Sequence, residues 1–186
     1  MDNSFELLGF IDDTPEKKGM NPYGQMVYGR EILEQFPNAL VLAVPGSPTS
    51  YKIRSKIIND LQLLPDRFAT VIHPKASVSS MAKIGKNVLI MAGVVVTSNS
   101  VIGDHVCILP NTAIHHDVNI GNYTLIGSNV SVAGSTVIED NCYIGSGTKL
   151  INNIRIGKNS LIGLGSNVIK SIPPESKAVG NPARLL

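Results

Sequence analysis

The sequence contains no tryptophan, only two cysteines and few aromatic residues. Aromatic side chains make up 5% of the 186 residues, whereas hydrophobic side chains make up 43%, so the core must be built mainly from aliphatic groups. Cys107 and Cys142 form no CxxC pair, which argues against a disulfide framework or a zinc knuckle. Because Cys142 falls at an inward position of the repeat described below, we expect it to be a buried core residue.

The chain also lacks a charge excess and a long apolar run. Its 16 basic and 14 acidic residues give a net charge of +2, which argues against nucleic acid or a membrane surface as a partner. No segment approaches the ~20 apolar residues that a membrane-spanning helix needs. The early run LLGFI is short and lies between Glu6 and Asp12 rather than beside Lys or Arg, so no secretory signal is expected. We therefore expect a cytoplasmic protein without a membrane span.

What the sequence does contain is a repeat of six residues. Ile, Val or Leu occupies every sixth position from Ile72 to Val168, without a miss or an insertion. A small or β-branched residue usually stands two positions before each of these, and Gly often follows directly. Three positions after them Asn, Asp or Gly recurs, as at Asn87, Asn99 and Asp117. Such residues are typical of turns, and Gly and Asn tolerate a positive φ, so the pattern predicts a bend every six residues.

The six-residue period predicts a parallel β-helix. A helical period of 3.6 cannot produce it, and the alternation of an ordinary strand lacks the regular bend. Short extended segments joined by tight turns do produce it, and each coil needs its neighbours to bury its apolar side. We expect the coils to occupy residues 72–172 and a C-terminal tail to occupy 173–186, where two Pro turns end the last coil.

Residues 1–71 show a different pattern, in which strand and helix signals alternate. The strand candidates are FELLGFI (5–11), ALVLAV (39–44) and FATVI (68–72), and the helix candidates are REILEQF (30–36) and a helix that begins at Ser47–Pro48, with an apolar stripe at Ile53, Ile57, Ile58 and Leu61. This alternation predicts a small α/β domain with a parallel sheet. Carboxylates at the carboxyl end of such a strand are well placed for ligand contact.

The tandem motif [LIV]-G-x-x-[STAV]-x resembles that of the hexapeptide-repeat acyltransferases. The resemblance implies a left-handed parallel β-helix with 18 residues per coil, assembled as a homotrimer whose active sites lie between neighbouring copies. Four further segments resemble one branch of these enzymes, the sialic acid O-acetyltransferases and the bacillosamine and perosamine N-acetyltransferases; they are GFIDD (9–13), HPKASVS (73–79), IHHDVNIG (114–121) and VGNPAR (179–184). In that branch a Rossmann-like domain precedes the β-helix. We expect a truncated version here, because residues 1–71 contain no glycine-rich GxGGHG loop.

The resemblance assigns the general base to the histidine directly before the acidic residue, which is His116, with Asp117 as its partner. A neighbouring negative charge orients the imidazole and favours its protonated form. Acetyl transfer needs a base because an amine or hydroxyl must lose a proton as it attacks a thioester, and a positioned base contributes about 10²–10⁴-fold. His115 is the rival base, whereas His73 and His105 are expected to be structural.

The resemblance also implies acetyl-CoA as co-substrate, with contacts at Leu125, Gly134, Ser146 and Leu164. Eighteen residues make one coil, so Gly134 should lie directly beside His116 and leave space for the thioester arm of the coenzyme. Leu125 stands where the bacillosamine enzymes have a histidine, so any hydrogen bond from that side chain is lost. Contacts made through backbone amides survive such a change.

The acceptor site is implied by fewer residues. Asp12 and Asp13 match the nucleotide-sugar contacts of the family, and Gly46 lies in the turn after the second strand candidate. In the tail, Lys170 could reach a phosphate or could be an ordinary exposed lysine. We expect residues 1–71 to form this nucleotide-sugar-binding part.

These features predict an acetyl-CoA-dependent transfer of an acetyl group to the amine of an amino sugar, probably nucleotide-linked and destined for a surface glycan. The alternative is O-acetylation of sialic acid, serine or another small hydroxyl acceptor. A γ-type carbonic anhydrase needs three histidines around one metal, which the four histidines do not supply, so no metal is expected. An ice-binding solenoid needs an outward ladder of threonines, whereas the threonines here, at 112, 124, 136 and 148, fall at inward positions.

Overall fold

The computed structural model describes residues 5–186, which form two compact units, residues 5–40 and Val41–Leu186. Residues 41–71 therefore belong to the same unit as the coils, whereas the sequence pattern groups them with residues 1–40. The cause is a set of direct contacts with the coils: the backbone of Ala43 bonds to the side chain of Asn87, and Tyr51 packs in a cluster with Cys107 and Leu125.

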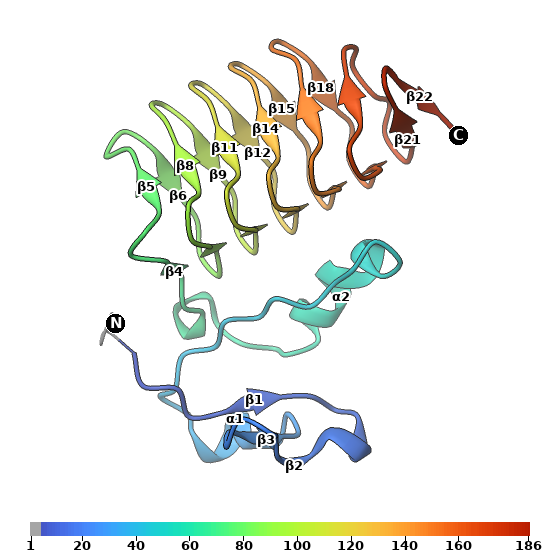
Figure 1. The fold of residues 1–186 in the computed structure, drawn as a ribbon. Helices are drawn as coiled ribbons and strands as arrows, with labels where there is room; N and C mark the ends of the chain where they lie inside the picture. The colour runs from blue at the N-terminus through green and yellow to red at the C-terminus, as the bar shows by residue number, and fades with distance from the viewer. Residues whose placement is uncertain (1–4) are drawn as a thin grey trace. The chain divides into compact units, whose positions relative to one another are not determined.

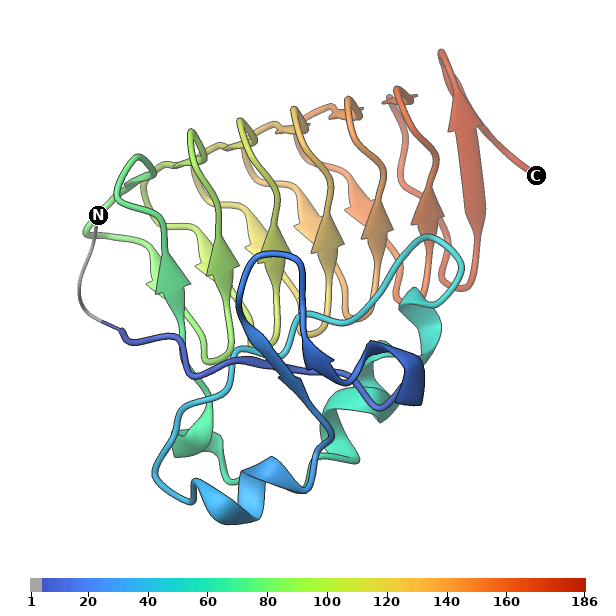
Figure 2. The ribbon, with the colours of Figure 1, turned by 60° about the horizontal axis from the view of Figure 1, so that its bottom comes forward.

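The larger unit is a parallel β-helix whose coils lie side by side along the chain (Figures 1 and 2). Its strands form three sheets, one on each side of every coil. The first face contains β4 (Val71–Ile72), β7 (Leu89–Ile90), β10 (Cys107–Ile108), β13 (Leu125–Ile126), β16 (Tyr143–Ile144) and β19 (Leu161–Ile162). The second face contains β5 (Ser77–Val78), β8 (Val95–Val96), β11 (Ala113–Ile114), β14 (Ser131–Val132), β17 (Lys149–Leu150) and β20 (Asn167–Val168). The third face contains β6 (Lys83–Ile84), β9 (Val101–Ile102), β12 (Asn119–Ile120), β15 (Val137–Ile138) and β18 (Arg155–Ile156).

Neighbouring coils pair in a constant register. Ile114 of β11 pairs with Val96 in the coil before and with Val132 in the coil after, a step of 18 residues in each direction. The predicted 18-residue coil is confirmed by the same step on all three faces. Each edge of the β-helix therefore carries one equivalent residue from every coil.

The core lies inside the coils and is aliphatic. The second residue of most strands points inward and is almost fully buried, as for Ile90, Ile108, Ile126, Ile138 and Ile156. Burial of each such side chain contributes about 1.5–3 kcal/mol. Between them, small residues bond to the coil above; the hydroxyl of Thr112, for example, donates to the carbonyl of Gly127 at 2.8 Å and accepts from the N–H of Val130.

Cys142 is fully buried in this core, as predicted. Its thiol lies 3.3 Å from the carbonyl of Gly157.

The predicted turns are confirmed by the backbone. The third residue after each inward rung is left-handed where it is Asn, as at Asn87, Asn99 and Asn153, with φ between 54° and 60°. Asn reaches this region at little cost. His105 and Tyr123 adopt it as well, at φ 61° and 60°, where other coils have Asn.

Residues 41–71 cover the first face. They contain a bridge between Val41 and Phe68, the 3-10 turns η2 (Tyr51–Ile53) and η3 (Pro65–Arg67), and helix α2 (Arg54–Asn59). The helix begins later than the predicted start at Ser47, because the carbonyl of Ser47 accepts the N–H groups of Ser50 and Tyr51 in a separate turn. The predicted apolar stripe is also shifted: Ile53 is 53% exposed, whereas Arg54 is buried.

The smaller unit contains β1 (Phe10–Ile11), the 3-10 turn η1 (Pro15–Lys17), β2 (Gly19–Met20), β3 (Met26–Tyr28) and α1 (Ile32–Gln35). Its sheet has the order β1-β3-β2, in which β1 and β3 are parallel and β2 and β3 are antiparallel. The sheet is therefore mixed rather than all-parallel, because the expected strand at 5–11 pairs only through its last two residues and a hairpin follows it.

The tail ends the β-helix with an antiparallel hairpin, β21 (Lys177–Gly180) and β22 (Ala183–Leu185), which continues the first face beyond β19. Within residues 5–186, none of the helices has the length and apolarity to cross a membrane.

Candidate active site

The candidate site lies on the edge between the second and third faces. The turn between β11 and β12 places His115, His116 and Asp117 there, and Val118 returns the chain to the core. The turn is held by the neighbouring coils: the N–H of Asp117 donates to Ser98 and the N–H of Ser135 donates to the carbonyl of His116. The side chains of His116 and Asp117 are thus presented from a rigid backbone.

His116 and Asp117 form a direct pair. Nδ1 of the imidazole lies 2.8 Å from Oδ2 of the carboxylate, and the two side chains are 61% and 50% exposed. The hydrogen bond with His116, and next to it one with the side chain of Asn99, holds the pKa of Asp117 below its ordinary value. An ionised carboxylate only accepts hydrogen bonds, so Nδ1 carries the proton and Nε2 keeps its lone pair. That is the arrangement of a general base.

Gly134 lies beside the imidazole, as the 18-residue coil predicts. A methyl group at this position would come 2.5 Å from Cε1 and 2.6 Å from Nε2 of His116. The space that the glycine leaves is therefore taken by the ring of His116, whereas the sequence suggested that it serves the thioester arm.

Two other histidines have structural surroundings. His105 lies on the edge between the third and first faces, where its Nδ1 is 2.9 Å from the side-chain nitrogen of Asn87, its ring stacks on Tyr123 at 4.7 Å, and Phe68 packs edge-on at 5.1 Å. Burial lowers the pKa of His105. His73 accepts the N–H of Lys75 through Nδ1.

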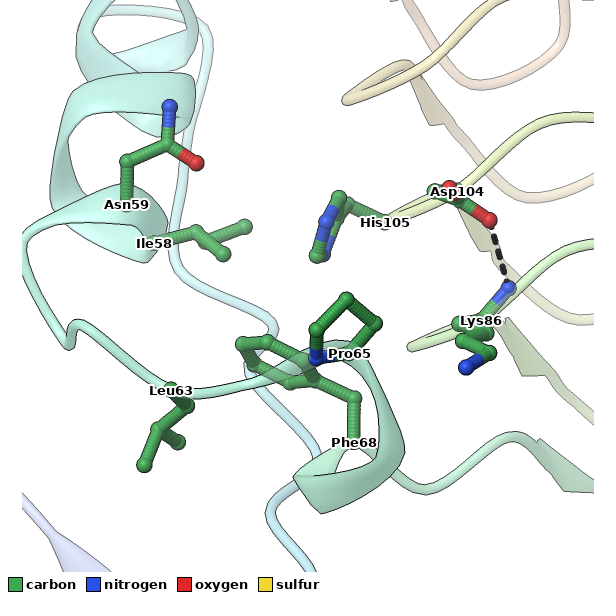
Figure 3. Close-up of a pocket in the computed structure, with 8 residues that line it drawn as sticks. All are labelled: Ile58, Asn59, Leu63, Pro65, Phe68, Lys86, Asp104 and His105. Atoms are coloured by element: carbon green, nitrogen blue, oxygen red, sulfur yellow. Dashed lines mark hydrogen bonds between the residues drawn. The ribbon is translucent and has the colours of Figure 1, made fainter.

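A hollow of about 220 Å³ lies beside His105, between the α2–η3 segment and the edge of the coils (Figure 3). Ile58, Phe68 and His105 are among its lining residues, and the carboxylate of Asp104 accepts the backbone N–H of Lys86 at its border. It is on a different edge from His116.

The predicted coenzyme residues lie in three places. Gly134 adjoins His116, whereas Ser146 and Leu164 are on the edge between the first and second faces. Leu164 is 73% exposed there, and the hydroxyl of Ser146 accepts the N–H of Ser128. Leu125 is only 9% exposed, because residues 41–71 cover it. Within one chain, the structure therefore brings only Gly134 to His116.

The predicted acceptor residues are divided between the two units. In the smaller unit Asp12 pairs with Lys17 at 2.8 Å and Asp13 with Arg30 at 2.5 Å. These hydrogen bonds hold the pKa of both carboxyl groups below their ordinary value. In the larger unit Gly46, at φ 128°, packs on Leu125, whose Cδ1 would be 2.8 Å from an added methyl group.

Sequence reasoning missed Arg54, which is buried and bonds to the carbonyl groups of Pro45 and His105. Its neighbours Lys52 and Lys56 are ordinary exposed lysines, so the charge pattern along the chain gave no signal for a buried cation.

Stacked three-sided coils with a His–Asp pair on one edge define the class of the hexapeptide acyltransferases. Residues 81–116, 99–134 and 135–170 each match the family model described as bacterial transferase hexapeptide (six repeats). The coiled part of the chain therefore belongs to that family, its fold is the left-handed parallel β-helix, and the protein is an acyltransferase.

Among solved structures, the chain is similar to PerB from Caulobacter crescentus, solved in complex with CoA and GDP-perosamine. The identity is 26%, 88% of this chain and 79% of that chain are covered, and the TM-score is 0.79. It is similar to the acetyltransferase domain of PglB from Neisseria gonorrhoeae FA1090, with 28% identity, 96% and 86% coverage and a TM-score of 0.79. WeeI from Acinetobacter baumannii AYE has 26% identity, 96% and 85% coverage and a TM-score of 0.79. No curated protein matches the chain significantly.

Within residues 5–186, no group of three or more His, Cys, Asp or Glu residues is arranged to hold a metal ion.

Proposed function

We propose that this protein transfers an acetyl group from acetyl-CoA to the amine of a nucleotide-linked amino sugar. The observation that carries the proposal is the exposed imidazole of His116, whose Nδ1 is bonded to Asp117 and whose Nε2 keeps its lone pair. The acceptor is supported by the likeness to PerB, whose structure contains CoA and GDP-perosamine.

In this proposal His116 is the general base and Asp117 orients it. When bound, acetyl-CoA supplies an acetyl group activated by its bond to sulfur. Nε2 of His116 accepts the proton that the amine loses as its nitrogen bonds to the acetyl carbon, and returns it to the thiolate that departs. Asp117 holds the tautomer with the proton on Nδ1 and stabilises the imidazolium that forms.

We further propose that the site is completed by a second copy in a homotrimer. Gly134 shares an edge with His116, whereas Ser146 and Leu164 lie on the next edge, with the second face between them. One chain cannot bring both edges to one coenzyme molecule, but neighbouring copies around a threefold axis can. Lys170, on the edge of His116 and three coils further along, is positioned to bind a coenzyme phosphate. Leu125 would take part only through its backbone, since its side chain is covered.

For the acceptor, we propose that Asp12, Asp13 and the turn at Gly46 contact the nucleotide sugar. The two carboxylates are exposed and ionised, and each would exchange part of its present pairing with Lys17 or Arg30 for hydroxyl groups of the ligand. Residues 1–71 would thus serve the acceptor, 72–172 the acetyl transfer, and 173–186 the closure of the last coil. Both substrates are metabolites of the cytoplasm, where we place the enzyme.

A thiol-release assay tests the proposed function. The purified protein is given acetyl-CoA with UDP-, GDP- or dTDP-linked amino sugars, and with CMP-sialic acid or serine to detect O-acetylation. We expect release with at least one amino sugar, loss of release in His116→Ala, and unchanged release in Asn152→Ala, which alters the same edge one coil beyond Gly134. No release with any amino sugar, or full activity of His116→Ala, would contradict the proposal.

A further inference from the structure

Arg54 is a buried cation in the segment that covers the first face. Its exposed fraction is 0%, and burial lowers its pKa to about 10, so the guanidinium is still charged at neutral pH. Burying a charge is costly unless it is paired or hydrogen-bonded. The partners recorded for Arg54 within residues 5–186 are two carbonyl groups, and its Nε has no hydrogen-bond partner there. An apolar side chain would fill the same space at lower cost, so the two bonds require another explanation.

The two carbonyl groups belong to distant parts of the chain. One is that of Pro45, directly before Gly46, and the other is that of His105 on the edge of the coils, 2.8 Å from the second guanidinium nitrogen. Arg54 therefore ties the start of the turn at residues 45–50 to the β-helix.

Asn87 reinforces this attachment. Its side-chain oxygen accepts the N–H of Ala43 at 2.7 Å, and its side-chain nitrogen lies 2.9 Å from both the carbonyl of Ala43 and Nδ1 of His105. The chain leading into the turn is thus fixed by both polar groups of one residue, on the same edge that Arg54 reaches.

The far end of the turn is attached to later coils. The hydroxyl of Tyr51 donates to the carbonyl of Asn159 at 3.1 Å, and Asn141 donates to the carbonyl of Lys52 at 3.2 Å. The turn therefore lies between two attachments, with Gly46 packed on Leu125 in the middle. The first attachment is buried, whereas the Lys52–Glu175 ion pair at the second is about half exposed.

We propose that Arg54 is a positioning residue of the acceptor site, which fixes the turn at residues 45–50 on the β-helix so that it meets the nucleotide sugar in one conformation. This rests on the proposed function, in which that turn contacts the acceptor. A turn that is already ordered loses less conformational entropy when the ligand binds. Removal of the guanidinium leaves two carbonyl groups without their donors and frees the turn, so it weakens acceptor binding and leaves the His116 edge unchanged.

The experiment compares Arg54→Met, Arg54→Lys and the control Lys56→Met, which alters an exposed lysine of the same helix. Amide hydrogen exchange is measured over residues 43–50 and over the coils, and steady-state kinetics are measured with the amino sugar that the wild type accepts. We expect faster exchange at 43–50 alone and a KM for the acceptor raised at least tenfold in Arg54→Met. The KM for acetyl-CoA and kcat should change less than threefold, Arg54→Lys should lie in between, and Lys56→Met should match the wild type.

Unchanged exchange at 43–50, or an unchanged acceptor KM in Arg54→Met, would overturn the role of Arg54 while the proposed function stands. A parallel loss in both KM values, kcat and protection of the coils would also overturn it, since a merely structural residue behaves in that way. If Arg54→Met does not fold, the same separation is required of Arg54→Lys. A wild type inactive with every amino sugar would instead overturn the proposed function, and the acceptor role of Arg54 with it.

Discussion

The imidazole of His116 rests against the α-carbon of Gly134, one coil further along the chain. A methyl group at residue 134 would overlap Cε1 and Nε2 of the ring, so Gly134→Ala should push the imidazole out of its position. Misplacement of a catalytic group by about 1 Å can cost on the order of 10²-fold in rate, and we expect a loss of that size. Gly134 is not among the glycines with a positive φ, so the backbone should accept alanine and the melting temperature should change little. Acetyl-transfer rates and thermal unfolding, measured beside Asn152→Ala, check this; a fully active Gly134→Ala would contradict it.

Replacement of Asp117 by asparagine separates charge from backbone geometry. Asn99 and Asn153 occupy the equivalent left-handed turn position in other coils, so Asp117→Asn should fold normally. It loses the negative charge that fixes the proton on Nδ1 of His116, and we expect kcat to fall by about 10²–10⁴-fold, the range for a positioned base. Steady-state kinetics at pH 7 measure the fall. Retention of more than half of the wild-type kcat would show that the carboxylate has no part in the reaction.

His105 should make the stability of the protein depend on pH. Its pKa is lowered in the folded state by burial, and Arg54 lowers it further, against the opposite effect of Asp104. The unfolded chain therefore binds more protons than the folded chain as the pH falls below the ordinary value of 6.5. The stabilisation is complete above that pH and is lost as the pH drops through the folded pKa.

We expect the free energy of unfolding to decline from pH 7.5 towards about pH 5, before the exposed carboxylates titrate, and this slope to be reduced in His105→Asn. Asn is the matched replacement because Asn87, Asn141 and Asn159 hold the same turn position. Urea unfolding at several pH values measures the slope. An identical slope in the variant would assign the pH dependence to other groups.

A site shared between copies should allow complementation. His116→Ala removes the base, and Leu164→Glu places a negative charge where we propose that the coenzyme binds, so each variant alone should be nearly inactive. In trimers assembled from equal amounts of both, a site with an intact base from one copy and an intact residue 164 from its neighbour should form in roughly one quarter of cases. Recovery of that fraction of wild-type activity after co-expression is the expected result. No recovery would mean that both residues act from the same chain.

The coils could be predicted from sequence because their signal is periodic. An apolar residue every sixth position, with Asn or Gly three residues later, fixes the side that faces inward and the place of each bend, and the structure has both at Ile114–Asp117 and at Ile138–Asn141. The pairing of Gly134 with His116 followed from the 18-residue coil alone. That Asp117 bonds to His116 was expected from the family resemblance.

The rest depends on contacts between distant segments, which leave no periodic trace. The strands Phe10–Ile11 and Gly19–Met20 are too short to show an alternation, so the mixed sheet was not predictable. Arg54 looks like its exposed neighbours Lys52 and Lys56 in the sequence, and only the carbonyl groups of Pro45 and His105 explain its burial. Leu125 has the outward position of an exposed residue, and it is covered because residues 41–71 lie on the first face.

The constant step of 18 residues also determines which changes in chain length the protein can tolerate. Duplication of 18 residues between Asn152 and Lys170 would add one layer, and Lys170 would stay in line with His116, about 4.8 Å further away. Insertion of six residues at the same point would rotate everything downstream by one third of a turn and carry Lys170 to another side. Natural variants that accept coenzymes with longer or shorter arms should therefore differ in length by whole layers.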